Sequence, residues 1–224
     1  MVVQVSVGRP RLAPRRREGT TAREEILDAA AELFSEHGYA ATSTRAIAMA
    51  VGIKQASLYY HFASKEQILA ELLEGTVIPS LDAADALAAS GEPVEARLWA
   101  LAAFDVRLLC SGRWNIGALY LMPESRSARF AGFHAQRVQL RAAYADLVGA
   151  GAGQGAFNCD DVTLAADLVF GLVESVVPVR ADRGRLDAEV VAPMVADGCL
   201  RLLAVPGRRS AATRRRAERL LATL

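Results

Sequence analysis

The segment Gln55 to His61, QASLYYH, carries many hydrogen-bonding and aromatic side chains for so short a stretch. A glutamine can pair with adenine through both groups of its amide, and a small side chain can contact the methyl group of thymine. Tyrosine and histidine side chains can hydrogen-bond to phosphate. These residue types therefore suit contacts with DNA bases and backbone. The candidate contact residues in this segment are Gln55, Ala56, Ser57, Tyr59, Tyr60 and His61.

Three helical segments are predicted to position these residues. The first begins at Thr21-Ala-Arg-Glu24, where the Thr and Glu side chains can form a capping box, and ends at Gly38. The second is expected to start after Ser43 and to close at Gly52, and the third to start near Gln55. Two short helices joined by a glycine turn are typical of a helix-turn-helix, whose second helix lies in the major groove of DNA.

Apolar residues at helical spacing explain how two such short helices stay fixed. Ile47, Ala48 and Val51 fall on one face of the second helix, and Leu58 and Phe62 fall on one face of the third. The polar and aromatic residues of the third helix are therefore expected to point outward.

Residues 21–72 resemble the DNA-binding domain of the TetR/AcrR family of bacterial transcriptional regulators. The resemblance rests on ILDAAAELFSEHGYAATSTRAIAMAVGIKQASLYYHFASKEQIL, above all on LYYHFASKE, the Gly52 turn and the Gly38-Tyr39 corner. It covers roughly a quarter of the chain, whose later helices match the family only in number, order and total length. The resemblance implies an all-α protein, with an N-terminal three-helix DNA-binding domain and a larger helical domain that binds a ligand and forms a dimer.

The resemblance also implies a role for individual residues. Arg45 matches a position that reaches a base edge or phosphate, and Gln55, Ala56 and Ser57 match the base-reading start of the recognition helix. Tyr59, Tyr60 and His61 match backbone or flanking-base contacts, and Lys65 matches a phosphate-binding lysine.

Two positions depart from the family pattern. Lys54 replaces a capping serine and could add a phosphate contact, and Ala46 replaces an acidic partner of Ser43; each change weakens a helix start by about 1 kcal/mol.

Several of these side chains also have a purely structural interpretation. Tyr59 could pack against the first helix, and His61 could bond a backbone carbonyl. Thr44 could contact phosphate, but its hydroxyl could equally serve the local backbone. The sequence leaves these alternatives open.

Helical spacing continues through the rest of the chain, so the fold class is predicted to be all-α, with about nine helices and possibly a short tenth in the basic tail. Ser64 and Gln67 are expected to cap a long fourth helix that Pro79 kinks or interrupts. Gly149–Gly155 is interpreted as a flexible linker, and Pro206-Gly207 as the end of the packed domain. The predicted domains are a basic, disordered arm (1–19), the helix-turn-helix domain (20–66), an effector-binding and dimerisation domain (67–206) and a basic tail (207–224).

The larger domain is expected to bind a small effector and to form a homodimer. Large side chains concentrate in its middle segments, which suits an apolar or aromatic ligand, although ordinary core packing is the favoured interpretation for any single one of them. The candidate lining is Trp99, Phe104, Trp114, Tyr120, Met122, Phe130, Phe133 and His134. By the resemblance, helices at about 160–177 and 186–203 pair across a two-fold axis.

The predicted function is that of a repressor that binds a palindromic operator in double-stranded DNA and is released by the effector. The alternative is a helix-turn-helix DNA-binding protein without a small-molecule effector.

Other classes of function find little support in the sequence. Gly151-x-Gly153-x-x-Ala156 matches a dinucleotide fingerprint only formally, because it follows a helix and has no βαβ context. The three histidines are far apart, no GxSxG motif occurs, and the three cysteines form no CxxC pair, so we expect no catalysis, cofactor, metal site or disulfide. With no run of 18 uninterrupted apolar residues and no secretory signal pattern, we expect no membrane span and a cytoplasmic location.

The net charge of +1 hides two basic ends. Residues 1–23 hold six arginines against one glutamate, and the stretch from Val205 to the end holds six more against one glutamate. Basic ends on an acidic body fit arms that meet phosphate, and Gly8-Arg-Pro-Arg11 resembles a minor-groove arm. Solvated tails that contact nothing are the competing interpretation.

Overall fold

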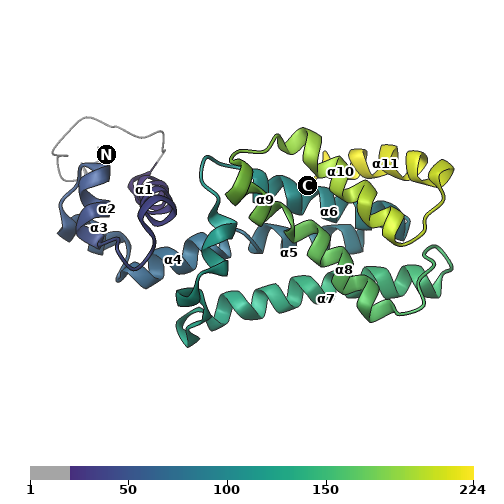
Figure 1. The fold of residues 1–224 in the computed structure, drawn as a ribbon, viewed down its shortest axis with the longest axis horizontal. Helices are drawn as coiled ribbons and strands as arrows, with labels where there is room; N and C mark the ends of the chain where they lie inside the picture. Colours follow the sequence, from purple (N-terminus) through teal and green to yellow (C-terminus); the bar gives the residue numbers. More distant parts are fainter. Residues whose placement is uncertain (1–20) are drawn as a thin grey trace, which may run out of the picture. The chain divides into compact units, whose positions relative to one another are not determined.

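The computed structural model describes residues 21–224, and every regular element in that range is a helix (Figure 1). The prediction of an all-α fold is confirmed. The predicted arm at residues 1–19, with its Gly8–Arg11 motif, lies outside the described residues.

The chain divides into two compact units, the first ending at Leu72 and the second running from Leu73 to Leu224. The sequence suggested a boundary after residue 66, at the start of the fourth helix. The structure instead keeps most of that helix with the first unit, where its apolar residues Ile68, Leu69 and Leu72 are buried.

The first unit consists of α1 (Ala22–His37), α2 (Thr44–Val51), α3 (Gln55–His61) and most of α4 (Lys65–Glu74). The predicted capping box of α1 is present, with Glu24 N donating to Thr21 Oγ1 and Thr21 N donating to Glu24 Oε2. Ser43 caps α2 as predicted, at 3.1 Å from Ala46 N. The predicted inward residues are buried: Ile47, Ala48, Val51, Leu58 and Phe62.

The start of α4 differs in one detail from the predicted capping box. Gln67 N donates to Ser64 Oγ as expected, at 3.2 Å. The Gln67 side chain, however, accepts from Ala63 N at 2.7 Å rather than from the Ser64 backbone. The second bond therefore satisfies a donor one residue earlier, in the corner between α3 and α4.

The second unit is built around α6 (Val94–Cys110), which contacts α5, α7, α8, α9, α10 and α11. Figure 1 shows α7 and α8 running side by side, in agreement with the contacts between them. Three short 3-10 helices, η1 (Ile116–Leu121), η2 (Pro123–Arg126) and η3 (Ala128–Phe130), lead into α7. The remaining α-helices are α5 (Ile78–Ala89), α7 (Ala131–Gly153), α8 (Val162–Glu174), α9 (Val176–Arg183), α10 (Ala188–Leu202) and α11 (Gly207–Leu221).

The interruption expected at Pro79 is present, and a second stretch, expected as a single helix, is also divided; a proline follows each break. The fourth helix ends at Glu74, and α5 restarts at Ile78 with Pro79 in its first turn. The apolar helix expected from about 160 to 178 ends at Glu174, and α9 restarts at Val176. A proline has no N–H to donate and is tolerated in a first helical turn, so both prolines favour a restart over continuation.

The interpretation of Gly149–Gly155 as a flexible linker is wrong for most of its length. Helix α7 continues to Gly153, and Phe157, itself buried, folds back over Gly151. The backbone N–H groups of Ala156 and Phe157 both donate to the Gly151 carbonyl, at 2.8 and 3.1 Å. The glycine here allows close packing of an aromatic ring on the helix backbone.

The C-terminal stretch contains a helix, α11, as the sequence allowed, but this helix packs on α6 and is not a tail beyond the packed domain. Thr213, Ala217 and Leu221 are buried at four-residue spacing. On its flanks, Arg216 pairs with Glu92 at 2.5 Å and Arg214 pairs with Asp197 at 3.5 Å. The packed region therefore extends beyond Pro206.

One described stretch, Val162–Arg183, is apolar enough by length and composition to cross a membrane, with a mean hydropathy of 1.8 over its most apolar window. A core helix of a soluble protein passes the same test. In this structure the stretch is divided at Ser175 into α8 and α9, and both helices contact α6.

Candidate nucleic-acid interface and regulatory core

The turn between α2 and α3 is made by Gly52, which ends α2 in the left-handed conformation at φ 79° and ψ 29°. A residue with a Cβ would be strained in this conformation. Ile53 N donates to Ala48 O at 3.0 Å across the turn. The following helix, α3, starts at Gln55 without a side-chain cap at Lys54, as the sequence indicated.

The residues predicted to contact DNA lie on the outer side of α2 and α3 or at the start of α4. Tyr60 is 87% exposed and Tyr59 is 48% exposed, so neither belongs to the core. Thr44, Ser57, His61 and Lys65 are half-buried. The exposed members of the set are Arg45, Lys54, Gln55, Ala56, Tyr59 and Tyr60.

A hydrogen-bond network crosses the surface between α2 and α3. Gln55 Nε2 donates to Thr44 Oγ1 at 3.0 Å, and the Tyr59 hydroxyl lies 3.1 Å from the same oxygen. Thr44 is the first residue of α2, while Gln55 and Tyr59 lie one turn apart on α3. The Thr44 hydroxyl therefore bonds two candidate DNA-contact side chains rather than the local backbone.

Lys65 contacts the corner between α1 and α2. Its ammonium group donates to the carbonyl oxygens of Tyr39 and Thr42, both at 2.8 Å, and lies 4.1 Å from the centre of the Tyr39 ring. An ammonium group has three N–H donors, so one remains beyond these two bonds. Lys65 thus has a structural role in addition to the phosphate contact implied by the resemblance.

Arg23 braces the C-terminal end of α3, and the sequence did not single it out. Its guanidinium donates to the carbonyl oxygen of His61 at 2.8 Å and to Glu71 of α4, and lies 4.2 Å from the Phe62 ring centre. Its partners are 38 and 48 residues away along the chain. No local pattern could have indicated this role, because the bonds depend on tertiary packing.

The predicted effector-binding residues do not form one cluster. Tyr120, Phe133 and His134 lie together, with ring centres 6.1 Å apart for the first two and 5.4 Å for the last two. Trp99 instead donates to Asp197 at 2.7 Å, and the Arg214 guanidinium lies 5.9 Å from its ring centre, so it belongs to the packing of α6 with α10 and α11. Phe130 is buried, and Phe104, Trp114 and Met122 are half-buried.

Beside the Tyr120 cluster, the structure assembles buried polar groups that the sequence did not reveal. The Asp105 carboxyl accepts from Ser80 Oγ and, at 3.0 Å, from the Tyr144 hydroxyl, and all three side chains are buried. Burial raises the pKa of Asp105 from 3.8 to about 6, and the two hydrogen bonds limit the rise. These groups come from α5, α6 and α7 and so connect three helices.

A second polar group lies between α7 and α8. Arg137 pairs with Glu174, and its guanidinium lies 4.3 Å from the Tyr120 ring centre. Burial and the Glu174 carboxylate raise the pKa of Tyr120, so its phenol stays protonated. The core formed by α5, α6, α7 and α8 therefore contains hydrogen-bonding groups beside the aromatic side chains, and both could contact a ligand.

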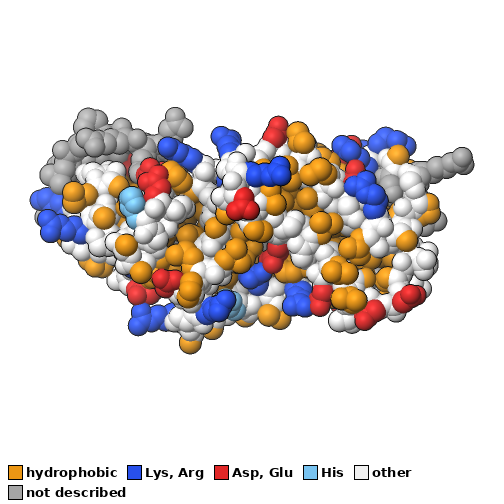
Figure 2. All heavy atoms as spheres, in the orientation of Figure 1, with side chains coloured by type: hydrophobic (Ala, Val, Ile, Leu, Met, Phe, Trp, Pro, Cys, Tyr) orange, Lys and Arg blue, Asp and Glu red, His pale blue; other side chains and the backbone are white. Residues whose placement is uncertain are grey.

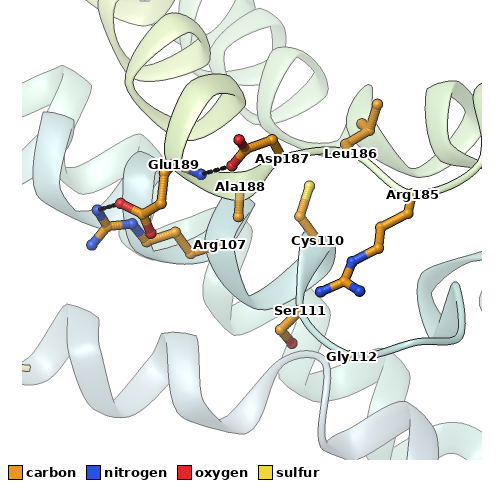
Figure 3. Close-up of a pocket in the computed structure, with 9 residues that line it drawn as sticks. All are labelled: Arg107, Cys110, Ser111, Gly112, Arg185, Leu186, Asp187, Ala188 and Glu189. Atoms are coloured by element: carbon orange, nitrogen blue, oxygen red, sulfur yellow. Dashed lines mark hydrogen bonds and ion pairs between the residues drawn. The ribbon is translucent and has the colours of Figure 1, made fainter.

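A hollow lies elsewhere, at the surface between the end of α6 and the start of α10. Its volume is about 600 Å³, and Figure 3 shows Arg107 paired with Glu189 at one side and the Cys110 thiol directed toward α10. Asp187 accepts from Glu189 N and so caps α10 at this edge. None of the predicted effector-binding residues lines this hollow. Its lining is Arg107, Cys110, Ser111, Gly112, Arg185, Leu186, Asp187, Ala188 and Glu189.

Cysteine and metal chemistry add no site within the described residues. The three cysteines are free thiols, with Cys110 and Cys199 buried as expected and Cys159 only half-buried. In residues 21–224 no three His, Cys, Asp or Glu side chains group in a way that could hold a metal ion.

Comparison with known proteins identifies the family. Residues 26–72 match the family described as bacterial regulatory proteins, tetR family. The KstR2 repressor of Rhodococcus jostii is 34% identical over 147 residues, which are 64% of this chain and 72% of that protein. The crystal structure of Mycobacterium smegmatis AmtR is 48% identical and superposes with a TM-score of 0.82, covering 92% of this chain and 98% of that one. The chain belongs to the TetR family.

KstR2 of Mycobacterium tuberculosis, a ketosteroid transcriptional regulator, agrees with this assignment. It is 53% identical over 53 residues, which are 24% of this chain and 26% of that protein. Its structure has a TM-score of 0.70 at 27% identity and covers 82% of this chain and 95% of that one. As a TetR-family member, the chain is a DNA-binding transcriptional regulator with a helix-turn-helix, and its relative KstR2 is named a transcriptional repressor.

Proposed function

We propose that this TetR-family protein is a repressor that binds a palindromic operator as a homodimer and is released by a small molecule. The observation that carries the proposal is the outer side of α3, where Gln55, Ala56, Tyr59 and Tyr60 are exposed beside the Gly52 turn. These side chains suit base-edge and phosphate contacts in a major groove.

The contacts with DNA divide by chemistry. Gln55, Ala56 and Ser57, in the first turn of α3, would read base edges. Tyr59, Tyr60 and His61 would contact phosphate or flanking bases, and Arg45 a base edge or phosphate. The cations Lys54 and Lys65 would contact phosphate, Lys65 through the N–H left over from its two carbonyl bonds.

An exposed apolar surface supports the dimer. Figure 2 shows hydrophobic side chains gathered over α8, α9 and α10. A helix face exposed in a single chain and rich in aliphatic residues commonly marks a contact between proteins. A two-fold dimer would present two α3 helices to half-sites about 34–36 Å apart, or a multiple of that spacing. The exposed aliphatic residues are Leu164, Leu168, Val179, Val190 and Met194.

The effector is proposed to bind in the core of the second unit, near Tyr120, Phe133 and His134. Because Asp105 and the Arg137–Glu174 pair lie in the same core, the ligand would combine an apolar or aromatic body with polar groups. Its binding would act on DNA through α4, which continues from one unit into the other. A coupling of about 1–3 kcal/mol between ligand and DNA binding is sufficient.

Selection of bound DNA from a random pool tests the proposal. The wild-type chain is expected to enrich a palindrome, and Gln55→Ala is expected to relax the preference at symmetric positions. Gln139→Ala, an exposed glutamine on α7, is the matched control and should leave the selected sequence unchanged. Enrichment of no sequence by the wild-type chain would overturn the proposal.

The alternative is a DNA-binding protein that senses no small molecule. A thermal-shift screen separates the two, since a ligand that binds only the folded chain raises its melting temperature. A stabilising compound that also lowers operator affinity favours the sensor; operator affinity that stays constant across a broad screen favours the alternative.

A further inference from the structure

Thr44 lies at the centre of a hydrogen-bond network that joins α2 to the outer side of α3. Its hydroxyl oxygen accepts from Gln55 Nε2 at 3.0 Å and lies 3.1 Å from the Tyr59 hydroxyl. Thr44 itself is held in place by its position, because it directly follows the capping Ser43 and precedes the buried Ile47 by one turn.

The network determines which hydrogen-bonding groups of Gln55 are available to bind DNA. One N–H of the Gln55 amide is engaged by Thr44, which leaves the second N–H and the oxygen Oε1. No hydrogen bond to Oε1 is found within residues 21–224. A donor and an acceptor side by side match the N7 acceptor and N6 donor that adenine presents in the major groove.

We propose that Thr44 is a positioning residue that sets the base preference of Gln55. The Thr44 hydroxyl fixes the Gln55 side-chain amide against α2, so that the remaining N–H and the oxygen Oε1 of this amide face one base. Adenine is the base that this donor and acceptor fit. This inference rests on the proposed operator binding and assigns the reading of one operator position. Without the bond, the exposed Gln55 side chain would sample other rotamers, and the loss of ordering would weaken discrimination between bases.

Tyr59 is the second anchor of the network. Its hydroxyl bonds the same oxygen from one turn further along α3, so it restricts the rotation of the Thr44 side chain. Removal of the Tyr59 hydroxyl leaves the Thr44–Gln55 bond in place and should have a smaller effect than removal of the Thr44 hydroxyl.

The test compares Thr44→Val, which removes the hydroxyl at nearly constant shape, with Thr44→Ser, which keeps it. For each variant, bound DNA is selected from a random pool, and affinity is measured for the selected site and for versions altered at the position that Gln55→Ala relaxes. Thr44→Val should relax that same position, with discrimination falling about three- to tenfold, a part of the value of a bidentate contact. Thr44→Ser should stay within about twofold of wild type on the same scale.

Two further measurements distinguish a positioning role of Thr44 from a direct contact between Thr44 and DNA. Affinity for nonspecific DNA and its salt dependence should be the same in all three proteins, because a positioning residue neutralises no phosphate and contacts none. In the background of Gln55→Ala, Thr44→Val should add nothing, since the effect passes through Gln55.

Several results would overturn the inference. Thr44→Val could weaken all sites alike, which would make Thr44 a direct backbone contact, or it could leave the preference intact. If Thr44→Val does not fold, Tyr59→Phe replaces it: a small relaxation at the same position supports the network, and relaxation elsewhere contradicts it. A wild-type chain that selects no sequence would instead remove the proposed function itself.

Discussion

Lys65 shows at the residue scale how one side chain can combine a surface role with a structural one. Its ammonium group donates to two backbone carbonyls of the corner between α1 and α2. The third N–H of the ammonium group remains for another partner. Sequence comparison alone suggests only the phosphate contact.

We predict that Lys65→Met lowers the free energy of unfolding by about 1–3 kcal/mol, because the carbonyl oxygens of Tyr39 and Thr42 lose a charged donor. Chemical denaturation measures the change. Lys54→Met is the matched control, since Lys54 is exposed and makes no side-chain capping bond, and it should stay within about 0.5 kcal/mol of wild type. Equal stability of the two variants would contradict the structural role of Lys65.

Asp105 gives a prediction for pH. Its pKa is raised to about 6 in the folded chain against 3.8 for the ordinary carboxyl, so between these values the folded state holds a proton that the unfolded state has released. Stability from this group is therefore present below about pH 4 and is lost as pH rises to about 6 and beyond, by about 3 kcal/mol in total.

The experiment compares the free energy of unfolding of wild type and Asp105→Asn from pH 4 to pH 8. The difference, variant minus wild type, should rise with pH and level off above about pH 7, because asparagine does not ionise. A difference that is flat across this range would show that the Asp105 carboxyl titrates normally.

Side chains on α3 were predictable from sequence, whereas their partners were not. The spacing of Leu58 and Phe62 fixes which side of α3 faces inward, so the outward position of Gln55 and Tyr60 follows from helical geometry. The bonds of Gln55 to Thr44 and of Arg23 to His61 join separate helices, and neither leaves a trace in local residue spacing.

At the scale of elements, glycine content misled the interpretation of the end of α7. Glycine is a poor helix former, so five small residues from 149 to 153 looked like a linker. The structure shows why a helix continues there: Phe157 packs on the helix backbone at Gly151, and a Cβ at that position would lie 2.1 Å from the ring.

Two substitutions in the same turn test this packing. Gly151→Ala is predicted to lower the melting temperature, because Phe157 must move away from the helix. Gly153→Ala, with no heavy atom within 4 Å of the new Cβ, is predicted to raise stability by up to about 1 kcal/mol through its helix propensity. If both variants behave alike in thermal unfolding, the contact with Phe157 does not exist.

The length of α11 and its packing on α6 were not predicted for a related reason, because the sequence suggested at most a short helix in a basic tail. Its sequence, GRRSAATRRRAERLL, is dominated by arginine and small residues, which suggests a solvated tail. Only Thr213, Ala217 and Leu221 mark the buried side, and alanine and threonine give a weak apolar signal. By contrast, α1, α2 and α4 have side-chain caps, and the buried apolar residues of α1 to α4 fall at helical spacing, so the positions of these helices were predictable.

At the scale of the whole molecule, the proposed dimer depends on the exposed apolar side chains of α8, α9 and α10. We predict that Leu168→Glu, on the exposed side of α8, shifts the protein from dimer to monomer in sedimentation experiments, because the dimer would bury an unpaired carboxylate. Met49→Glu, at an exposed position on α2, is the control and should remain dimeric. A wild-type protein that is monomeric at micromolar concentration would contradict this assembly.

The packing partners of the predicted effector-binding residues could not be predicted from the sequence. Composition indicated which segments held large side chains, but not which helix each side chain would face. Trp99 faces α10 and α11, whereas Tyr120 packs against Phe133 and Arg137 of α7. The charged groups of this core came from Asp105, Arg137 and Glu174, which lie far apart in the sequence.

The central claim is that this chain reads DNA through the outer side of α3. The most direct measurement is the affinity of wild type and Gln55→Ala for the selected operator and for a scrambled duplex at several salt concentrations. Wild type should prefer the operator by about 10³-fold or more, and Gln55→Ala should lose about 5- to 150-fold of that preference while its salt dependence stays unchanged. Equal affinity of wild type for operator and scrambled duplex, or an unaltered preference in Gln55→Ala, would contradict the claim.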